Sequence, residues 1–143
     1  MLIFQHSTDK RFKAWYDFRQ QLETVDNPLD VVAKVYSSTP RVKVYSDPYD
    51  RSTWPTPWEL IEENEYCPFN QVLGVAYSLA LTERFKDWQP TITIAVDTSN
   101  MCVYYLLYHN DKVYGFEDDV WIPAKMLPKT LTIKKIYHLD GLH

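Results

Sequence analysis

The stretch Trp54-Pro55-Thr56-Pro57-Trp58-Glu59-Leu60-Ile61 is followed by Tyr66-Cys67-Pro68-Phe69-Asn70-Gln71 and then by a long apolar run. Thr56 and Glu59 have the spacing of a capping box, in which each side chain accepts the backbone N–H of the other residue. They predict a helix that runs to about Glu63. Pro68 suits the first turn of a second helix, because proline has no N–H to leave unpaired there. The pattern predicts a short helix, a break, and a second helix with Cys67 at its start.

This second helix, over about 68–85, is expected to be the buried centre of the domain. Gly74 and Ala76 are small enough to let a neighbouring element approach closely. Apolar residues cover most of its circumference, which is typical of a helix surrounded by other elements. They are Phe69, Val72, Leu73, Ala76, Leu79, Ala80 and Leu81.

Periodicity on either side of this stretch predicts the other elements. A first helix begins at Ser7 or Thr8 and runs to about Thr24, and a second begins at Asn27-Pro28 and ends before Ser37. Residues 41–45 alternate and predict a short strand. After Pro90 the period changes to two. Strands are predicted over 91–96, 101–108, 112–116 and 130–139, with an irregular segment over 120–127.

Helices followed by antiparallel strands indicate an α+β domain, with the N-terminal helices and the central helix packed on a C-terminal antiparallel sheet. A chain of 143 residues has the length of one domain with one core. We expect a single domain over 1–143. Within it, we expect N-terminal helices in 1–40, a cysteine-bearing helical segment in 41–87 and the sheet in 91–139.

Composition excludes several classes of function. The formal net charge is -4 and the basic residues are scattered, so we expect no nucleic-acid partner. No apolar run approaches the roughly 20 residues that span a bilayer, and residues 1–4 are too short for a signal peptide, so we expect no membrane partner. Two cysteines and four dispersed histidines do not have the spacing of a zinc site, and no glycine motif for phosphate exists. We therefore expect no metal and no cofactor, and reduced thiols in a cytoplasmic setting.

Cys67 allows two interpretations. The dipole and the unpaired N–H groups at a helix start favour a thiolate and are suited to stabilising an oxyanion, which fits a nucleophile. Free cysteines are more often small buried residues that pack the core. Position alone leaves both interpretations open.

The surroundings of Cys67 resemble the transglutaminase-like cysteine proteinases, which belong to the wider transglutaminase and papain-like superfamily. The shared features are Trp54, the Thr-Pro-x-Glu helix start at Thr56, and a cysteine about ten residues further on that begins a long apolar helix. The resemblance covers roughly residues 40–120. It implies a transglutaminase-like fold in which Cys67 stands at the nucleophile position. It also implies that Glu117 or Asp118 stands at the position of the acid that orients the base.

The chain departs from the family at the position of the catalytic histidine. That position falls on Met101 or Cys102, and neither side chain can act as a base. A cysteine nucleophile needs a base within hydrogen-bond reach. His109 is expected about 26 Å further along the strand, at the far end of the hairpin. Since His6 and His143 lie near the chain ends, His138 remains as the candidate base.

Our leading hypothesis is a non-catalytic binding or assembly domain on a degenerate transglutaminase-like fold. Its partner is expected to be a protein, and analogy with enzyme folds kept as structural parts suggests a phage or viral protein, located in the virion. Eleven tyrosines and five tryptophans predict an aromatic contact surface, with Trp121–Pro128 as its candidate. The alternative is an active cysteine hydrolase or acyl transferase with Cys67 as nucleophile, Glu117 or Asp118 as orienting acid and His138 as base. A third interpretation is a plain structural domain in which Cys67 only packs.

Overall fold

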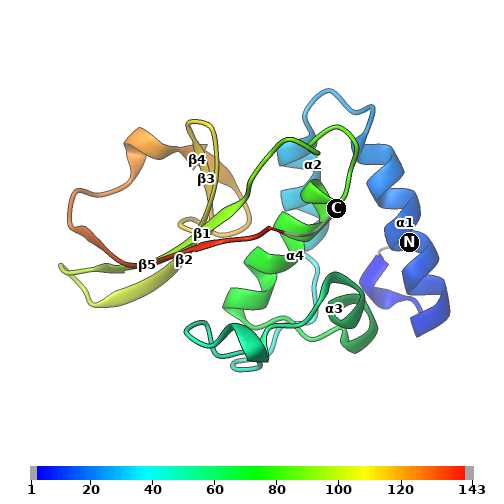
Figure 1. Cartoon of the computed structure of the whole chain (residues 1–143), viewed down its shortest axis with the longest axis horizontal. Helices are drawn as coiled ribbons and strands as arrows, with labels where there is room; N and C mark the ends of the chain where they lie inside the picture. Colours follow the sequence, from blue (N-terminus) through cyan, green and yellow to red (C-terminus); the bar gives the residue numbers. More distant parts are fainter. Residues whose placement is uncertain (1–2, 141–143) are drawn as a thin grey trace.

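The computed structural model describes residues 3–140 and has an α+β architecture, as the sequence predicts (Figure 1). The helices gather at one end of the molecule, and the strands extend away from them. Within the described residues the α-helices are α1 (Thr8–Leu22), α2 (Pro28–Tyr36), α3 (Pro57–Glu63) and α4 (Pro68–Ala80). The strands are β1 (Thr91–Asp97), β2 (Cys102–His109), β3 (Lys112–Tyr114), β4 (Trp121–Pro123) and β5 (Leu131–His138). Single 3-10 turns occur at Ile3–Gln5, Arg51–Thr53 and Ala124–Met126.

The strands form one antiparallel sheet in the order β4-β3-β2-β1-β5. The register of the central strands is given by Ile94 in β1, which pairs with Tyr105 in β2 and with Lys135 in β5. A bulge between Ile94 and Ala95 shifts the pairing with β5 at this level. The sheet meets the helices mainly where β2 packs on α4 and β4 packs on α2.

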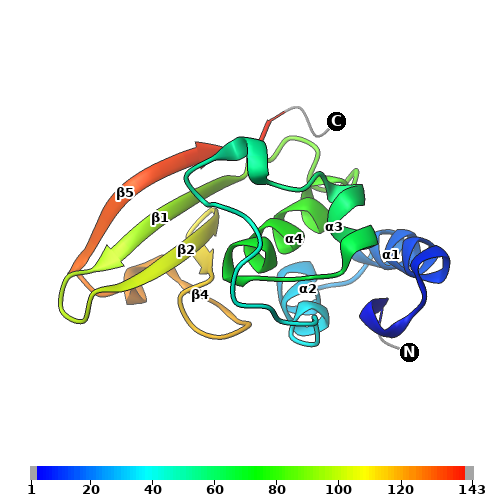
Figure 2. The same ribbon diagram turned by 90° about the horizontal axis from the view of Figure 1, so that it is seen from below.

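Helix α4 lies between the sheet and the other helices (Figure 2). All of its residues from Phe69 to Ala80 are buried, as the apolar pattern predicts. On the helical side, the Ser78 hydroxyl meets the Trp15 indole N–H at 3.0 Å and the Tyr36 hydroxyl at 2.7 Å. The close approach expected at Gly74 is confirmed, since a Cβ there would lie 2.5 Å from the Tyr36 ring. No helix in residues 3–140 is both long enough and apolar enough to cross a membrane.

The end of α4 differs from the sequence prediction. The helix predicted over about 68–85 ends at Ala80. The Glu23 carboxylate, at the end of α1, accepts the backbone N–H groups of Glu83 at 2.8 Å and Arg84 at 2.9 Å. This contact replaces helical hydrogen bonds by a turn that is anchored on α1. The partner is 60 residues away in the chain, so local periodicity does not reveal it.

Two segments of the chain also differ from their predicted structure. Residues 41–45 form no strand, because only Arg41 makes a bridge, in parallel with Tyr66. The segment predicted as irregular over 120–127 contains β4 and a 3-10 turn. Trp121 in β4 is 8% exposed and packs on Tyr114, with ring centroids 5.6 Å apart. Trp121 is therefore a core residue and does not provide an aromatic contact surface.

Asp97 ends β1 and connects the β1–β2 turn to the start of β5. Its carboxylate accepts the Thr130 hydroxyl at 2.6 Å, the Ser99 hydroxyl at 2.7 Å and the Ser99 N–H at 2.9 Å. These hydrogen bonds, first the one from Thr130 and then those from Ser99, lower the pKa of Asp97.

We expect this carboxylate to make stability depend on pH. A carboxyl whose folded pKa is lowered stabilises the fold above its ordinary value of about 3.9, and this contribution is lost as the pH falls through the folded pKa. Urea unfolding should therefore show Asp97→Asn to be less stable than wild type at about pH 6, with the difference shrinking below about pH 4. A difference that stays constant over this range would show that the ionised form contributes nothing.

Candidate functional site

Cys67 is the N-cap of α4, as the sequence predicts. Its backbone is extended, its side chain makes no capping hydrogen bond, and Pro68 occupies the first turn of the helix. The residue before it is held in place, because the Tyr66 N–H donates to the Pro40 carbonyl at 3.0 Å and the Val42 N–H donates to the Tyr66 carbonyl at 3.1 Å. Cys67 itself is only 3% exposed. The start of α4 therefore holds the Cys67 thiol in a fixed position, and this residue is almost completely buried.

The loop over 43–48 provides the cover. The loop follows Arg41, which forms a β-bridge with Tyr66, and it borders a small hollow of about 150 Å³ beside Cys67. This hollow is lined by Lys43, Val44, Ser46, Pro48, Cys67, Pro68, Phe69 and Tyr105. The loop and strand β2 together therefore enclose the sulfur.

Two contacts hold this loop in place. The Tyr45 hydroxyl is hydrogen-bonded to the Glu63 carboxylate at the end of α3, which raises the pKa of Tyr45 to about 12. Further along, the Trp54 indole N–H donates to the Asp47 carbonyl at 3.0 Å. The segment over Cys67 is thus attached on both sides to the helical part of the domain.

Tyr105 is the β2 residue that lies against Cys67. Its ring packs edge-on against Phe69, with centroids 5.3 Å apart. Burial raises the pKa of Tyr105, and the negative charge of a Cys67 thiolate beside it raises the pKa further. At neutral pH the phenol consequently keeps its proton. A protonated phenol does not take a proton from a thiol.

The resemblance places the catalytic base of the family at Met101 or Cys102. In the structure, the β2 residue that lies beside the Cys67 thiol is Tyr105. Met101 is 71% exposed in the β1–β2 turn, where it has a positive φ of 61°. Cys102 is exposed and pairs with Asp97 at the start of β2. Both precede Tyr105 by three or four residues, or roughly 10–13 Å along the strand. The sequence predicted strand β2, but it did not predict that Tyr105 is the residue of this strand that faces the start of α4.

His138 is not brought to Cys67. Tyr137 packs on Trp54 with centroids 4.8 Å apart, and Trp54 packs on Phe69 at 4.8 Å, so Tyr137 faces the helices. Successive side chains of a strand point to opposite faces, which places the His138 side chain on the other face of the sheet. Its carbonyl accepts the Arg51 guanidinium at 2.9 Å. His138 therefore belongs to the outer end of β5.

The other described histidines also lie away from the thiol. His109 is at the far end of β2, as expected, and its ring lies 5.2 Å from that of Phe85 and 5.4 Å from that of Trp88. His6 precedes α1, and its carbonyl accepts the Arg11 guanidinium at 2.7 Å. His143 lies outside the described residues. No histidine in residues 3–140 lines the hollow around Cys67.

The acidic loop does approach the start of α4. Glu117 and Asp118 are exposed and line a second hollow of about 260 Å³. This hollow shares Pro68 and Tyr105 with the one around Cys67. Glu117 and Asp118 therefore lie on one side of Pro68 and Tyr105, and Cys67 lies on the other side.

A chain of hydrogen bonds from the core to the surface, which the sequence did not reveal, positions this acidic loop. The Gln71 side chain in α4 bonds the Thr39 hydroxyl at 2.5 Å, and that hydroxyl accepts the Arg41 Nε–H at 2.9 Å. Arg41 in turn donates to the Asp119 carboxylate at 3.0 Å. The only local signal is that Gln71 and Thr39 are polar residues beside strongly apolar segments, which does not identify their partners.

Comparison with known proteins relates this geometry to one fold. No family model and no curated protein matches the sequence. Among solved structures, calcium-bound Legionella pneumophila LapG superposes with a TM-score of 0.71 at 20% identity, over 96% of this chain and 78% of that one. Legionella pneumophila LapG and its EGTA-treated form give TM-scores of 0.68 and 0.69 at 19% identity, over 96% of this chain and 76% of each of theirs. The chain has a transglutaminase-like fold.

This likeness confirms the fold that the resemblance implies, and at 20% identity or less it concerns the fold alone. One of the LapG structures is calcium-bound. Within residues 3–140, no group of three or more His, Cys, Asp or Glu side chains is arranged to hold a metal ion.

Proposed function

We propose that this chain is a non-catalytic binding or assembly domain on a transglutaminase-like fold whose catalytic set is incomplete. The observation that carries the proposal is the position of Tyr105, which fills the place beside Cys67 where a base would be needed. Acyl transfer from a thiol requires a group that accepts the thiol proton and returns it to the leaving group. A half-buried phenol with a raised pKa does neither at neutral pH.

Limited access to the thiol supports the same proposal. Cys67 is 3% exposed under the loop that Tyr45 and Trp54 hold in place. A nucleophile must approach within about 3–3.5 Å of the carbon it attacks. With the loop in this position, only a small part of Cys67 is accessible to a peptide or ester group.

Exposed apolar side chains support a role in binding a protein. Large apolar residues that stay in solvent are enriched where proteins meet partners. Within residues 3–140 they lie both on the helical part and on the sheet part of the domain. The most exposed are Val44 at 82%, Met101 at 71%, Met126 at 66% and Ile133 at 59%, followed by Tyr49, Trp58 and Tyr16. By analogy with enzyme folds retained as structural parts, the assembly we propose is a phage or viral particle.

The proposal is tested with p-nitrophenyl acetate, a small activated ester that needs no specific pocket. We expect no turnover above that of Cys67→Ala, and we expect mass spectrometry to find acetylation on Cys102 and not on Cys67. Tyr105→Phe and His138→Ala should leave both results unchanged.

A burst of p-nitrophenol followed by turnover would contradict this proposal if it disappears in Cys67→Ala. Loss of the same turnover in His138→Ala would establish the alternative, a cysteine hydrolase with Cys67 as nucleophile and His138 as base.

A further inference from the structure

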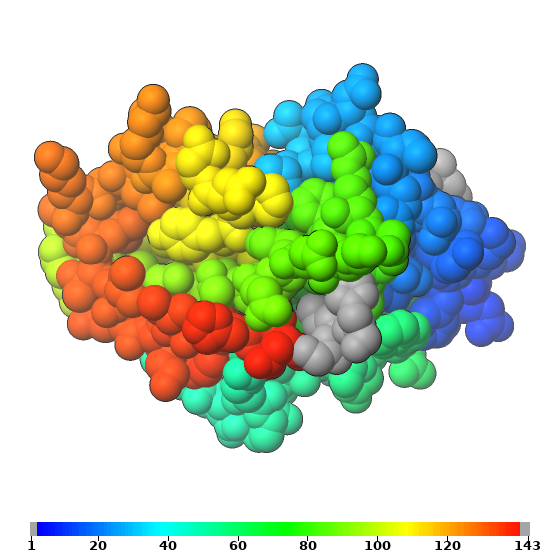
Figure 3. All heavy atoms as spheres, turned by 45° about the horizontal axis from the view of Figure 1, so that its top comes forward, coloured from blue at the N-terminus to red at the C-terminus, as the bar shows by residue number. Residues whose placement is uncertain are grey.

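A second candidate site is a hollow that lies away from Cys67, at the other end of β2. It has a volume of about 890 Å³, which is within the range of ligand sites in proteins. Three segments form it: residues 26–30 at the start of α2, residues 84–89 after α4, and residues 109–112 in the β2–β3 hairpin. These segments meet on one face of the molecule, in blue, green and yellow (Figure 3).

One wall of this hollow is aromatic. The rings of Phe85, Trp88 and His109 contact one another, with centroid separations of 5.8, 5.2 and 5.4 Å. Burial lowers the pKa of His109, so its ring is neutral at pH 7. Trp88 and His109 are half-buried and present part of their surfaces to the hollow. The faces of such rings are negative and attract cations.

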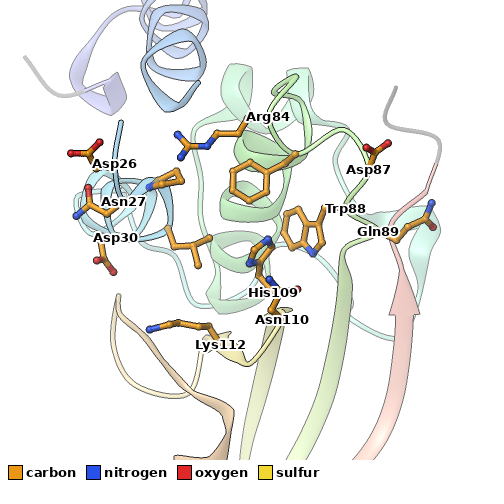
Figure 4. Close-up of a pocket in the computed structure, with 13 residues that line it drawn as sticks. Asp26, Asn27, Asp30, Arg84, Asp87, Trp88, Gln89, His109, Asn110 and Lys112 are labelled. Atoms are coloured by element: carbon orange, nitrogen blue, oxygen red, sulfur yellow. The ribbon is translucent and has the colours of Figure 1, made fainter. Parts of the chain in front are cut away.

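The opposite rim carries carboxylates without partners. Asp26 and Asp30 are exposed at the start of α2, across the hollow from Trp88 and His109 (Figure 4). Within residues 3–140, neither carboxylate makes a hydrogen bond or an ion pair. Asp87 lies beyond Trp88 on the other side. Negative charge therefore stands on both sides of the aromatic wall.

Two cationic side chains, Arg84 and Lys112, also border the hollow, and only that of Arg84 makes hydrogen bonds within the described residues. The Arg84 guanidinium donates to the carbonyls of Leu22 at 3.1 Å and Val25 at 2.6 Å, and the Glu23 carboxylate is bonded to its backbone N–H. Lys112 is exposed at the lower rim and makes no ion pair within the described residues. The Arg84 guanidinium keeps its positive charge in these hydrogen bonds, so the carboxylates of Asp26, Asp30 and Asp87 face two cations, and the hollow carries one net negative charge.

We propose that this hollow binds a lysine or arginine side chain from a basic, extended segment of a partner protein. The cation would lie on the faces of Trp88 and His109, with Asp26 and Asp30 near its charge and Leu29 against its methylene groups. An anionic ligand would be repelled by the carboxylates of Asp26 and Asp30, and a purely apolar ligand would remove them from water without compensation. The proposal names the partner class for the binding function proposed above and therefore rests on it.

The test uses the full chain and an acetylated, amidated decapeptide of alternating arginine and glycine. The control peptide has citrulline in place of each arginine, which keeps the shape and removes the charge. We expect saturable NMR shifts of the Trp88 indole and the His109 ring with the arginine peptide, and at least about tenfold weaker binding of the citrulline peptide. Equal binding of the two peptides, or shifts only at other residues, would overturn the proposal.

Charge variants at the rim provide the matched controls. We expect the double variant Asp26→Asn/Asp30→Asn to weaken binding about three- to tenfold, and Lys112→Gln to strengthen it about two- to threefold. Glu62→Gln/Glu65→Gln removes the same charge from exposed positions outside the hollow and should change the affinity less than about twofold. If both double variants weaken binding equally, the effect is the net charge of the chain and the site is disproved.

Failure of this site is distinguishable from failure of the proposed function. Cys67→Ala should bind the arginine peptide as wild type does. Absence of peptide binding together with absence of ester turnover overturns the site and leaves the non-catalytic role in place. Ester turnover that depends on Cys67 overturns the non-catalytic role, whichever peptide binds.

Discussion

Gly115→Ala is expected to destabilise the domain by about 3 kcal/mol, because two separate costs meet at this residue. Gly115 follows β3 and has a φ of 109°, a conformation that residues with a Cβ rarely adopt. An added Cβ would also overlap the backbone carbonyl oxygen of Tyr105. A backbone atom in the sheet gives way less easily than the end of a side chain. Urea unfolding of the variant should therefore show a lower midpoint at an unchanged slope.

Asn110→Ala is a matched control for this prediction. Asn110 lies in the β2–β3 turn and also has a positive φ, of 53°, so the variant reports the cost of backbone strain. We expect it to cost about 1 kcal/mol. If Gly115→Ala costs no more than Asn110→Ala, the close approach to Tyr105 is absent, and the placement of Tyr105 beside Cys67 loses support.

Arg11→Met is the second change with a large expected effect, a loss of about 3 kcal/mol in the free energy of unfolding. The Arg11 guanidinium is buried and donates to the carbonyls of Ile61 at 2.6 Å, His6 at 2.7 Å and Glu62 at 2.8 Å. The last residues of a helix leave their carbonyls without intrahelical partners, so Arg11 completes the end of α3. Methionine has a similar length and removes all three donors.

Lys10→Met provides the comparison for Arg11→Met, since Lys10 is the exposed neighbour on the same helix. It should change stability by less than about 0.5 kcal/mol. Equal effects of the two variants in urea unfolding would show that the Arg11 hydrogen bonds contribute nothing. That result would remove the main link between α1 and α3 described here.

The sequence predicted well those features that depend on neighbouring residues. The capping box is present as predicted, with the Thr56 hydroxyl accepting the Glu59 N–H at 3.2 Å and the Glu59 carboxylate accepting the Thr56 N–H at 2.9 Å. Pro28 and Pro68 begin helices, as proline does when its missing N–H costs nothing. Cys67 consequently stands where the motif places it, at the mouth of the central helix.

The features that escaped prediction depend on residues far apart in the chain. Arg11 appears in the sequence as an ordinary charged residue of an amphipathic helix, and its carbonyl partner Ile61 is 50 residues away. The choice of Tyr105 to face Cys67 depends on the register between α4 and β2. Side chains alternate between the two faces along the whole strand, so the sequence pattern does not indicate which residue of the strand packs against the start of a helix. The place of Cys67 at the start of α4 was thus predictable from the sequence, and the residue opposite it was not.

The central claim is that Cys67 stands on a transglutaminase-like scaffold as an enclosed thiol without a base. Iodoacetamide labelling of both cysteines in the same molecule, followed by peptide mass spectrometry, tests this most directly. Cys102 is exposed and serves as the internal reference for a free surface thiol. We expect Cys67 to react at least about 100-fold more slowly than Cys102 in the native protein, and at the same rate in urea. Native labelling of Cys67 as fast as that of Cys102 or faster, slowed by His138→Ala, would contradict the claim.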